Sequence, residues 1–329
     1  MANNKIRWGI LSTARIAHQF ADDFAFVSNG TLAAVASRSA EKAAEFAARH
    51  EIPVAYSSYE QLYDDPDIDA IYIATPHSLH CRNATDALRA GKAVLCEKPL
   101  ALSLGEIDAL ADVLAETDGY LMEAMWTWFL PAISKALEWF EAGEIGQLLH
   151  IRSDFGYPLP YSAESREYNA GLGGGVVADM GIYPIAIAYL FTRRSPTSIE
   201  VVSRNAPNGV EDDVVAIFDY ADYVATLSCS FRCKLPNQTH IIGDKGHIVI
   251  PDFWAASECH LYRIDEKIDS FTDGRRSRGY DYEATAVGED LIEGRRESGT
   301  MPLAVSRVFQ EHIEIGRASC RERGVGGGG

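Results

Sequence analysis

A lysine and several imidazole, hydroxyl and carboxyl side chains stand directly after strand-like runs of this sequence. Lys98 lies in Glu97-Lys98-Pro99, behind the apolar run Ala93–Cys96. A lysine in a cleft beyond a strand can hydrogen-bond a substrate oxygen and lower the pKa of a nearby hydroxyl. The segment Thr75–His80 follows the run Ala70–Ala74 in the same way. Because parallel strands end at one sheet edge, we predict a binding site there. Its candidate residues are Thr75, Pro76, His77, His80, Glu97 and Lys98.

The first strand-to-helix turn has small side chains where a dinucleotide site needs them. In the run Gly9–Ala17, the residues Ser12, Ala14 and Ala17 take the three small positions of a Gly-x-Gly-x-x-Gly/Ala motif. Small residues let the backbone approach a pyrophosphate at the helix N-terminus. Two glycines of the motif are absent, so the turn alone fits a plain strand–helix connection equally well. The residues expected to contact a dinucleotide are Ser12, Thr13, Ala14, Arg15 and Ile16.

The end of the second predicted strand favours a phosphorylated cofactor. Ser37 and Arg38 stand where NAD sites usually carry an acidic residue, and Lys42 follows one turn later. An arginine and a hydroxyl suit a 2′-phosphate, and no carboxylate is present to repel it. The alternative is a solvent-facing arginine at a helix start. We predict NADP as the cofactor, with NAD less favoured.

The first 120 or so residues alternate strand-like and helical patterns. The predicted strands are Arg7–Leu11, Thr31–Ala36, Ala70–Ala74 and Ala93–Cys96, and the predicted helices are Ala14–Phe26, Ala40–His50 and Cys81–Ala90. This rhythm implies a parallel sheet with right-handed crossovers. Gly91, just past the last of these helices, is expected to end it.

After about residue 145 strand follows strand without intervening helices. The predicted strands are Leu148–Asp154, Ser198–Ser203, Val214–Tyr220, Val224–Phe231, Thr239–Ile242, His247–Ile250 and Glu258–Tyr262. This order indicates a mostly antiparallel sheet. The expected fold class is α/β, with a Rossmann dinucleotide-binding domain over residues 1–124. An α+β domain with an open, mostly antiparallel sheet is expected over residues 125–314.

Composition excludes several classes of partner. The 329 residues carry a net charge of −17, which argues against nucleic acid or an anionic membrane as the main partner. We expect no apolar run long enough to span a membrane. The six cysteines are scattered without CxxC spacing, and the N-terminus lacks an export-signal pattern. We therefore expect reduced thiols, no metal site and a cytoplasmic location.

The last residues are expected not to be native. Residues 315–329 begin with IGRASCRER and end in glycines, which resembles the translation of a DNA-sequencing adapter. Without the three Arg and one Glu of this tail, the net charge moves from −17 to −19. The run Ser306–Glu314 is typical of an amphipathic helix that is cut off, so the natural C-terminus is expected to be missing.

Three motifs carry a resemblance to a known family. They are Ala93–Pro99 (AVLCEKP), Leu121–Thr127 (LMEAMWT) and Asp179–Tyr183 (DMGIY). With these motifs in order, the sequence resembles the Gfo/Idh/MocA family (glucose–fructose oxidoreductase / inositol dehydrogenase) from Arg7 to about Glu314. It most resembles the branch of dimeric trans-dihydrodiol dehydrogenases and NADP-dependent D-xylose dehydrogenases. The resemblance implies an active site between the two domains and a homodimer paired through the open sheets.

The resemblance also implies residue roles. Lys98 matches the family's catalytic lysine and Tyr183 its acid–base tyrosine, whose phenolate the lysine would favour. Asp179 lies four residues earlier, so on a helix it faces the same way. Many relatives carry histidine at the Tyr183 position, so tyrosine favours the dihydrodiol/xylose branch. The aromatic residues that the resemblance assigns to the substrate pocket, which spacing alone would place in the core, are Trp126, Phe155 and Trp254.

The implied function is hydride transfer between nicotinamide and a hydroxyl carbon of an aldose such as D-xylose, or of a trans-dihydrodiol. The alternatives are another sugar or cyclitol dehydrogenase of the family (inositol, anhydrofructose or amino sugar), or an NADP-binding regulator without turnover. A third alternative is that the chain is inactive because its native C-terminus is missing.

The triglycine Gly173–Gly175 would allow close approach to substrate or cofactor, or would form a flexible loop.

Overall fold

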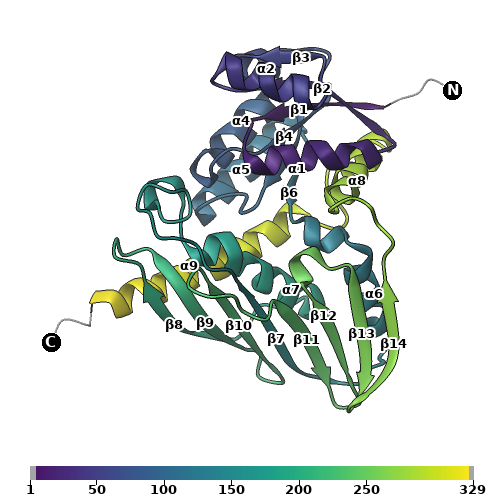
Figure 1. The fold of residues 1–329 in the computed structure, drawn as a ribbon, viewed down its shortest axis with the longest axis vertical. Coiled ribbons are helices and arrows are strands. Elements are labelled where there is room, and N and C mark those ends of the chain that lie inside the picture. Colours follow the sequence, from purple (N-terminus) through teal and green to yellow (C-terminus); the bar gives the residue numbers. More distant parts are fainter. Residues whose placement is uncertain (1–4, 326–329) are drawn as a thin grey trace. The chain divides into compact units, whose positions relative to one another are not determined.

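The computed structural model describes residues 5–325, with side chains through residue 318 (Figure 1). The chain forms two units. Unit 1 contains the residues up to Trp126 together with Arg276–Arg307, and unit 2 contains Thr127–Arg275 together with the residues from Val308 on. The predicted boundary at residues 124/125 lies two residues before this division, and Arg276–Arg307, within the predicted second domain, belongs to unit 1.

Unit 1 is built on a six-stranded parallel sheet in the order β3-β2-β1-β4-β5-β6. The strands are β1 (Ile6–Leu11), β2 (Gly30–Ala36), β3 (Val54–Tyr56), β4 (Ala70–Ile73), β5 (Ala93–Glu97) and β6 (Leu121–Ala124). The helices between them are α1 (Arg15–Asp23), α2 (Ala40–Arg49), α3 (Tyr59–Tyr63), α4 (His80–Arg89) and α5 (Leu104–Thr117). The predicted Rossmann architecture is confirmed.

Local chemistry explains where these elements begin and end. Every residue of β4 and β5 is buried, as central parallel strands require. The side chains of Ser39, Ser58 and Ser103 cap α2, α3 and α5 by accepting backbone N–H bonds. Gly91 follows α4 with φ +78, a left-handed conformation that glycine adopts at little cost, so its predicted role is confirmed.

Helix α8 (Tyr280–Ile292) explains why the chain returns to unit 1. It packs on α1 and on strands β1 and β2. The buried carboxylate of Asp23 accepts the backbone N–H of Gly279 at 2.9 Å and that of Tyr280 at 3.1 Å, which caps the first turn of α8. This cap joins residues more than 250 positions apart, so no local pattern announces it.

Unit 2 is built on an eight-stranded sheet in the order β14-β13-β12-β11-β7-β10-β9-β8, in which only β7 and β10 pair in parallel. The strands are β7 (Leu148–Gly156), β8 (Ser198–Asn205), β9 (Glu211–Asp219), β10 (Val224–Ser230), β11 (Gln238–Gly243), β12 (His247–Pro251), β13 (Glu258–Arg263) and β14 (Glu266–Thr272). The mostly antiparallel sheet is confirmed. The edge strand β14 was not predicted, because almost all its residues are exposed and show no apolar alternation.

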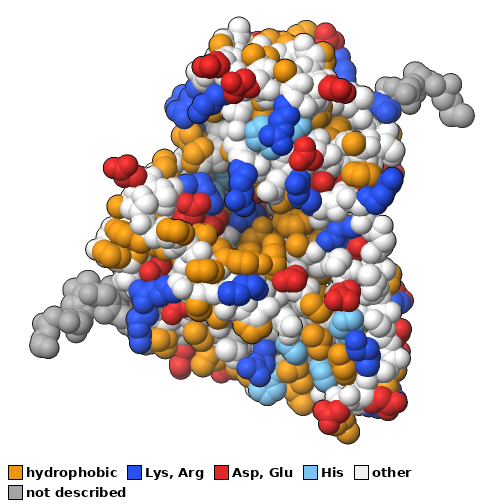
Figure 2. All heavy atoms as spheres, in the orientation of Figure 1, with side chains coloured by type: hydrophobic (Ala, Val, Ile, Leu, Met, Phe, Trp, Pro, Cys, Tyr) orange, Lys and Arg blue, Asp and Glu red, His pale blue; other side chains and the backbone are white. Residues whose placement is uncertain are grey.

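Helices cover one face of this sheet and leave the other open (Figure 1). Helix α6 (Pro131–Glu141) packs on β12–β14, and α7 (Ile182–Thr192) packs on β7 and β10. The open face carries histidine, hydrophobic and charged side chains together (Figure 2). Because half of the sheet faces solvent, its strands alternate buried and exposed residues.

A π-helical turn, Val177–Gly181, leads directly into α7. The segment Ala170–Thr192 is long and apolar enough by composition to cross a membrane, but 89% of its window is buried inside the protein. The prediction that the chain has no apolar run of this length is therefore wrong. Burial of this kind is typical of a core helix, whose all-round apolar surface packs against neighbours.

The last helix, α9, spans Leu303–Val325. It contains the predicted helix Ser306–Glu314 and continues through residues 315–325, which the sequence analysis set aside as adapter-derived. Within that stretch Arg317 contacts Glu211 at 3.1 Å and donates to the carbonyl of Gly174 at 2.7 Å.

Candidate active site

The first turn of unit 1 keeps the backbone shape of a dinucleotide site without its glycines. Ser12 has φ +98, a conformation that side chains other than glycine rarely adopt. Its N–H donates to the carbonyl of Ala36 at 2.9 Å, which holds the turn against β2. Ser12, at the first position of the motif, therefore has the positive φ that a glycine would adopt there.

The start of α1 has no side-chain cap from its N-cap residue. Ala14 precedes the helix in an extended conformation, and no described side chain caps its first turn. Helices α2, α3 and α5 of the same unit do have serine caps. The first N–H groups of α1, at Arg15 and Ile16, thus form a donor set suited to an anion such as a pyrophosphate.

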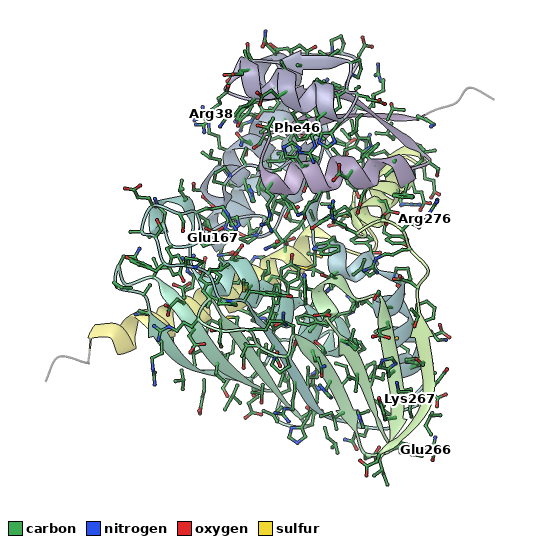
Figure 3. All side chains as sticks on the ribbon, viewed as in Figure 1. Arg38, Phe46, Glu167, Glu266, Lys267 and Arg276 are labelled. Carbon is green, nitrogen blue, oxygen red and sulfur yellow. The ribbon has the colours of Figure 1, made fainter. Side chains whose placement is uncertain are left out.

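The three residues predicted to hold a 2′-phosphate follow β2 and differ in their exposure to solvent. Ser37 is buried and its hydroxyl accepts the N–H of Ser39 at 3.3 Å. Arg38 is exposed (Figure 3) and lines a cavity of about 290 Å³. Lys42 is exposed and is not among the residues that line this cavity. Burial raises the pKa of Tyr59, a neighbour in the cavity, and the charge of Arg38 opposes that rise.

His80 ties together the two loops that follow β4 and β5. Its Nδ1 lies 2.8 Å from the carbonyl oxygen of Pro99, and its Nε2 lies 2.8 Å from that of Thr75. A carbonyl oxygen only accepts hydrogen bonds, so the neutral ring makes one of these bonds and the imidazolium makes both. The Thr75 hydroxyl also accepts from Asn83 at 3.0 Å, and the His77 ring lies edge-on to His80 at 5.6 Å.

Lys98 is the first residue after β5, and it begins the loop to which His80 and the buried carboxyl group of Glu123 bind. The peptide bond from Lys98 to Pro99 is cis. Glu123 accepts the N–H of Leu100 at 2.9 Å, which holds the loop from below. Burial raises the pKa of Glu123 to about 7, while the bond from Leu100 and the charge of Lys98 oppose the rise. Lys98 is therefore close enough to act electrostatically on this carboxyl.

Glu97, predicted to contact cofactor, is largely used by the protein core. Its side chain is buried and accepts the hydroxyl of Tyr72 at 2.5 Å. Tyr72 in turn stacks on Phe20 at 3.8 Å, and burial raises its pKa. Glu283 on α8 is also fully buried, and burial followed by the charge of Glu97 raises its pKa. Glu97, at the end of β5, thus interacts with the core residue Tyr72 through a hydrogen bond and with Glu283 through its charge.

In unit 2 two of the predicted pocket aromatics form a wall beside Tyr183. Phe155 on β7 stacks on Trp254 with ring centres 4.6 Å apart, and Tyr183 meets Phe155 edge-on at 5.3 Å. The carbonyl of Trp254 accepts the hydroxyl of Thr127 at 2.7 Å, which fixes the turn that carries it. The third predicted aromatic, Trp126, belongs to unit 1, where it stacks on Tyr280 at 4.5 Å.

Asp179 lies in the π-helical turn rather than in the α-helix that the sequence analysis expected. A π-turn holds more residues per turn than an α-helix, so residues four apart still project to the same side. Asp179 and Tyr183 therefore keep the shared face that their spacing predicted. Arg166 pairs with Asp179, with Nη2 3.1 Å from Oδ1.

The triglycine is required by the protein's own backbone. A Cβ on Gly174 would come within 2.7 Å of the carbonyl oxygen of Glu167 and 2.8 Å of that of Arg166. Gly173 and Gly175 have φ +83 and +128, and the N–H of Gly175 donates to Glu167 at 2.8 Å. The close approach is thus made to residues 166–167, and the hydrogen bonds are those of a fixed turn.

The comparisons with known proteins cover nearly the whole chain. Residues 6–125 match the family model described as the oxidoreductase family with an NAD-binding Rossmann fold, and residues 133–249 match that of the GFO/IDH/MocA C-terminal domain. The chain belongs to the Gfo/Idh/MocA oxidoreductase family. Trans-1,2-dihydrobenzene-1,2-diol dehydrogenase of Mus musculus is 34% identical over 95% of this chain and 96% of its own length.

Solved structures share the two-domain fold of this Gfo/Idh/MocA chain. Aldose-aldose oxidoreductase from Caulobacter crescentus, complexed with glycerol, matches with a TM-score of 0.88 at 22% identity, over 97% of this chain and 98% of its own. Levoglucosan dehydrogenase, in complex with NADH and levoglucosan, matches with a TM-score of 0.85 at 21% identity and the same coverage. At these identities the likeness concerns the fold.

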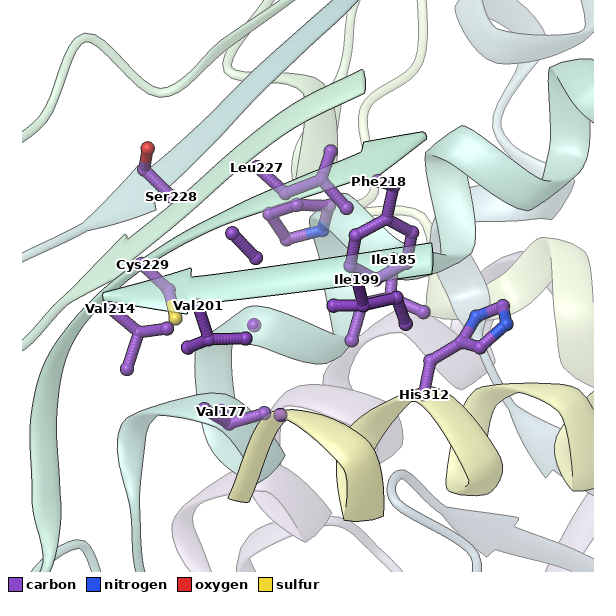
Figure 4. Close-up of a pocket in the computed structure, with 14 residues that line it drawn as sticks. Val177, Ile185, Ile199, Val201, Val214, Phe218, Leu227, Ser228, Cys229 and His312 are labelled. Carbon is purple, nitrogen blue, oxygen red and sulfur yellow. The ribbon is translucent and has the colours of Figure 1, made fainter. Parts of the chain in front are cut away.

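A small apolar cavity in unit 2 is lined in part by Val177 and Gly181, the first and last residues of the π-turn that carries Asp179 (Figure 4). Its volume is about 30 Å³, room for about one water molecule. It lies between the covered face of the sheet and helices α7 and α9, and includes His312, whose pKa burial lowers to about 4. We interpret it as a packing void behind the sheet.

Four residues that contact candidate side chains or their loops were not predicted. Asn83 and Glu123 hold the two loops of unit 1, Tyr59 lines the cavity beside Arg38, and Arg166 pairs with Asp179. Glu123 lies inside the motif Leu121–Thr127, which is the signal that could have identified it. The other three sit on a helix or in a loop, where their residue types are common on any surface.

Proposed function

We propose that this chain is an NADP-dependent dehydrogenase that acts on a CH–OH group of a small polyol, either an aldose of the D-xylose type or a trans-dihydrodiol. The observation that carries the proposal is the stacked pair Phe155–Trp254 beside Tyr183. Such a wall accepts the apolar face of a sugar ring or of a cyclohexadiene diol and leaves its hydroxyls toward polar groups. The 34% identity to a dihydrodiol dehydrogenase supports the diol arm.

The residues of unit 1 fit a dinucleotide. The glycine-like turn at Ser12, the uncapped start of α1 and the residues beyond β4 and β5 all lie at the carboxyl edge of one parallel sheet. Ligands of open α/β sheets bind at this edge, where the strand order reverses between β1 and β4. When bound there, NADP supplies the hydride acceptor.

NADP is proposed over NAD because of Arg38. No carboxylate stands at the end of β2, and the exposed guanidinium of Arg38 lines the adjoining cavity. Since a solved neighbour binds NADH, NAD is the competing outcome. Substituting Arg38→Ala is expected to raise KM for NADP by about tenfold or more and to leave KM for NAD almost unchanged. An equal change for both cofactors would contradict this assignment.

The proposed chemistry follows from the residue types. As the substrate C–H hydride departs, the O–H proton passes to the phenolate of Tyr183, and the ammonium of Lys98 favours that phenolate. The carboxylate of Asp179 accepts a substrate hydroxyl and orients it. The roles of Lys98 and Tyr183 rest on the family resemblance.

The test is the absorbance of reduced nicotinamide, with NADP and NAD against aldopentoses, aldohexoses, inositols and a trans-dihydrodiol. Turnover of a pentose or dihydrodiol that Lys98→Met abolishes supports the proposal. Turnover of inositol alone would favour another substrate class of the family. Tight NADP binding without turnover of any substrate would favour a regulator.

We also propose a homodimer paired through the open sheet face. Val202, Val215 and Ile217 on neighbouring strands are 50%, 42% and 43% exposed on that face, an apolar patch of the kind that a second copy covers. Light scattering of the wild type and of Val215→Asp tests it: a dimer that the substitution splits is expected. A monomeric wild type would overturn it.

A cytoplasmic location is proposed from the cysteine pattern. Six cysteines without disulfide-framework spacing suit a reducing compartment. Fractionation of cells that produce the tagged protein tests this location.

A further inference from the structure

Arg166 reaches from a loop of unit 2 to the π-turn in front of α7. Its Nη2 lies 3.1 Å from Oδ1 of Asp179 and 3.3 Å from Oε1 of Glu167. The Asp179 side chain is only 13% exposed, and a carboxylate so largely withdrawn from water is costly unless a cation pairs with it. The resemblance that assigned Asp179 did not include this arginine.

The loop that carries Arg166 is held by its own hydrogen bonds. The hydroxyl of Tyr168 donates to the carbonyl of Leu159 at 3.1 Å, and Asn208 donates to the carbonyl of Tyr168 at 2.7 Å. The backbone of residues 166–167 also packs directly on Gly174, where a side chain would not fit. The guanidinium is therefore presented from a fixed base, as a positioning group requires.

Several other titratable groups surround the π-turn that carries Asp179. Glu211 on β9 faces Gly175 and pairs with Arg317 of α9 at 3.1 Å, while Glu167 adds a second negative charge. Cys229 on β10 lies against Gly181, and Tyr183 follows on α7. The acidic neighbours oppose ionisation of Asp179, and Arg166 counters them.

We propose that Arg166 is a positioning residue, which keeps Asp179 ionised and aimed to the side of the π-turn that Tyr183 shares. This inference rests on the proposed function, because it assigns the arginine to the same substrate-orienting carboxylate. Arg166 acts through Asp179 and transfers no proton itself. A planar guanidinium suits the role, because it addresses two carboxylates at once and keeps its charge at every working pH.

The test compares Arg166→Met, Arg166→Lys and the matched control Arg232→Met. Arg232 is half-exposed and pairs with the buried carboxylate of Asp212 at 2.8 Å, in the same unit but outside the π-turn. Arg166→Met is expected to lower kcat/KM by roughly tenfold to a hundredfold. It should also move the acid limb of the kcat/KM profile up by about one pH unit or more.

Arg166→Lys should restore most of the acid limb, because that limb depends on charge, while kcat/KM recovers only in part. Arg232→Met should leave the limb in place. A uniform loss of activity in Arg166→Met with an unmoved limb, or an equal move in Arg232→Met, would overturn the proposal.

A second readout separates this inference from the proposed function. Carbon-13 NMR of labelled aspartate, with the Asp179 signal assigned through Asp179→Asn, follows the carboxyl without turnover. Its titration is expected to move to higher pH by about one unit or more in Arg166→Met. No turnover in the wild type would refute the proposed function alone, whereas an unmoved Asp179 titration would refute the role of Arg166 alone.

Discussion

The sheet edge of unit 1 and the aromatic wall of unit 2 hold their functional side chains by different physics. At the edge, His80 and Glu123 fix the loop of Lys98 through buried hydrogen bonds to backbone atoms. At the wall, ring packing places Phe155 and Trp254 beside Tyr183.

This difference predicts which of the two regions tolerates amino-acid substitutions. A buried hydrogen bond is directional, and removing one partner leaves the other unsatisfied in a low-dielectric interior. Ring packing depends on area and shape, which a similar side chain partly restores. Substitutions at the edge should therefore damage stability and function together, while substitutions at the wall should change substrate preference with little cost to the fold.

The largest effect is expected at the wall residue that carries chemistry. Tyr183→Phe removes one hydroxyl and keeps the ring contact with Phe155, so kcat should fall by roughly 10²- to 10⁴-fold while the unfolding midpoint stays almost constant. Tyr189→Phe, on the same helix, is the control. Activity within tenfold of wild type would show that Tyr183 is part of the wall and not the acid–base group.

His80→Ala should lower the free energy of unfolding, because it removes the side chain that binds the loops after β4 and β5. It removes the imidazole donor from the carbonyl oxygen of Thr75, of Pro99 or of both, according to the protonation of the ring, at about 1–3 kcal/mol for each hydrogen bond lost. Urea unfolding measures the loss, with the exposed His150→Ala on β7 as control. If both variants unfold at the same urea concentration, the clamp does not stabilise the fold.

Glu123→Gln should change how stability depends on pH. The folded pKa of about 7 lies above the ordinary value of 4.5, so the folded state holds this proton more tightly than the unfolded state. Wild-type stability should therefore fall as pH rises from about 4.5 to 7, by at most about 3 kcal/mol from this group. The glutamine variant should lose that part of the slope in denaturant titrations between pH 4.5 and 8. An unchanged slope would mean that another group, such as the buried Glu283, dominates it.

The smallest effect is expected at the outer ring of the wall. Trp254 is half-buried, so Trp254→Leu should cost little stability. Loss of its stacking on Phe155, worth about 0.5–1.5 kcal/mol, should raise KM for an accepted diol by roughly two- to tenfold with kcat nearly constant. Trp254→Phe should restore most of the affinity. A fall in kcat instead would place Trp254 nearer the chemistry than proposed.

How far the sequence predicts each region follows from the same contrast. The Rossmann unit was predictable because its signals are local: apolar runs of strand length, and site residues placed directly after them at Ser12, Thr75 and Lys98. Two other features could not be predicted, because each joins residues that only the folded chain brings together. They are the cap from Asp23 to α8 and the ion pair of Arg166 with Asp179.

The wall shows the limit most clearly. Phe155 and Trp254 lie 99 residues apart on a strand and in a short turn, and each fits an ordinary core pattern. Only the family resemblance singled them out. Arg38 and Lys42, which charge logic groups together, are both exposed, and Ser39 between them caps α2 by accepting the N–H of Lys42.

The π-turn Val177–Gly181 affects how the sequences of related enzymes should be aligned. A π-turn arises when a helix takes in one extra residue, because its hydrogen bonds reach one position further than those of an α-helix. Removal of a single residue from Val177–Gly181 would restore a regular helix. If the lost residue were Met180 or Gly181, Asp179 and Tyr183 would stand three positions apart instead of four, a spacing that on an α-helix still leaves both side chains on one face. Lineages that share this carboxylate–tyrosine geometry can therefore differ in its spacing, so homologous sites are better matched by helix phase than by counting residues.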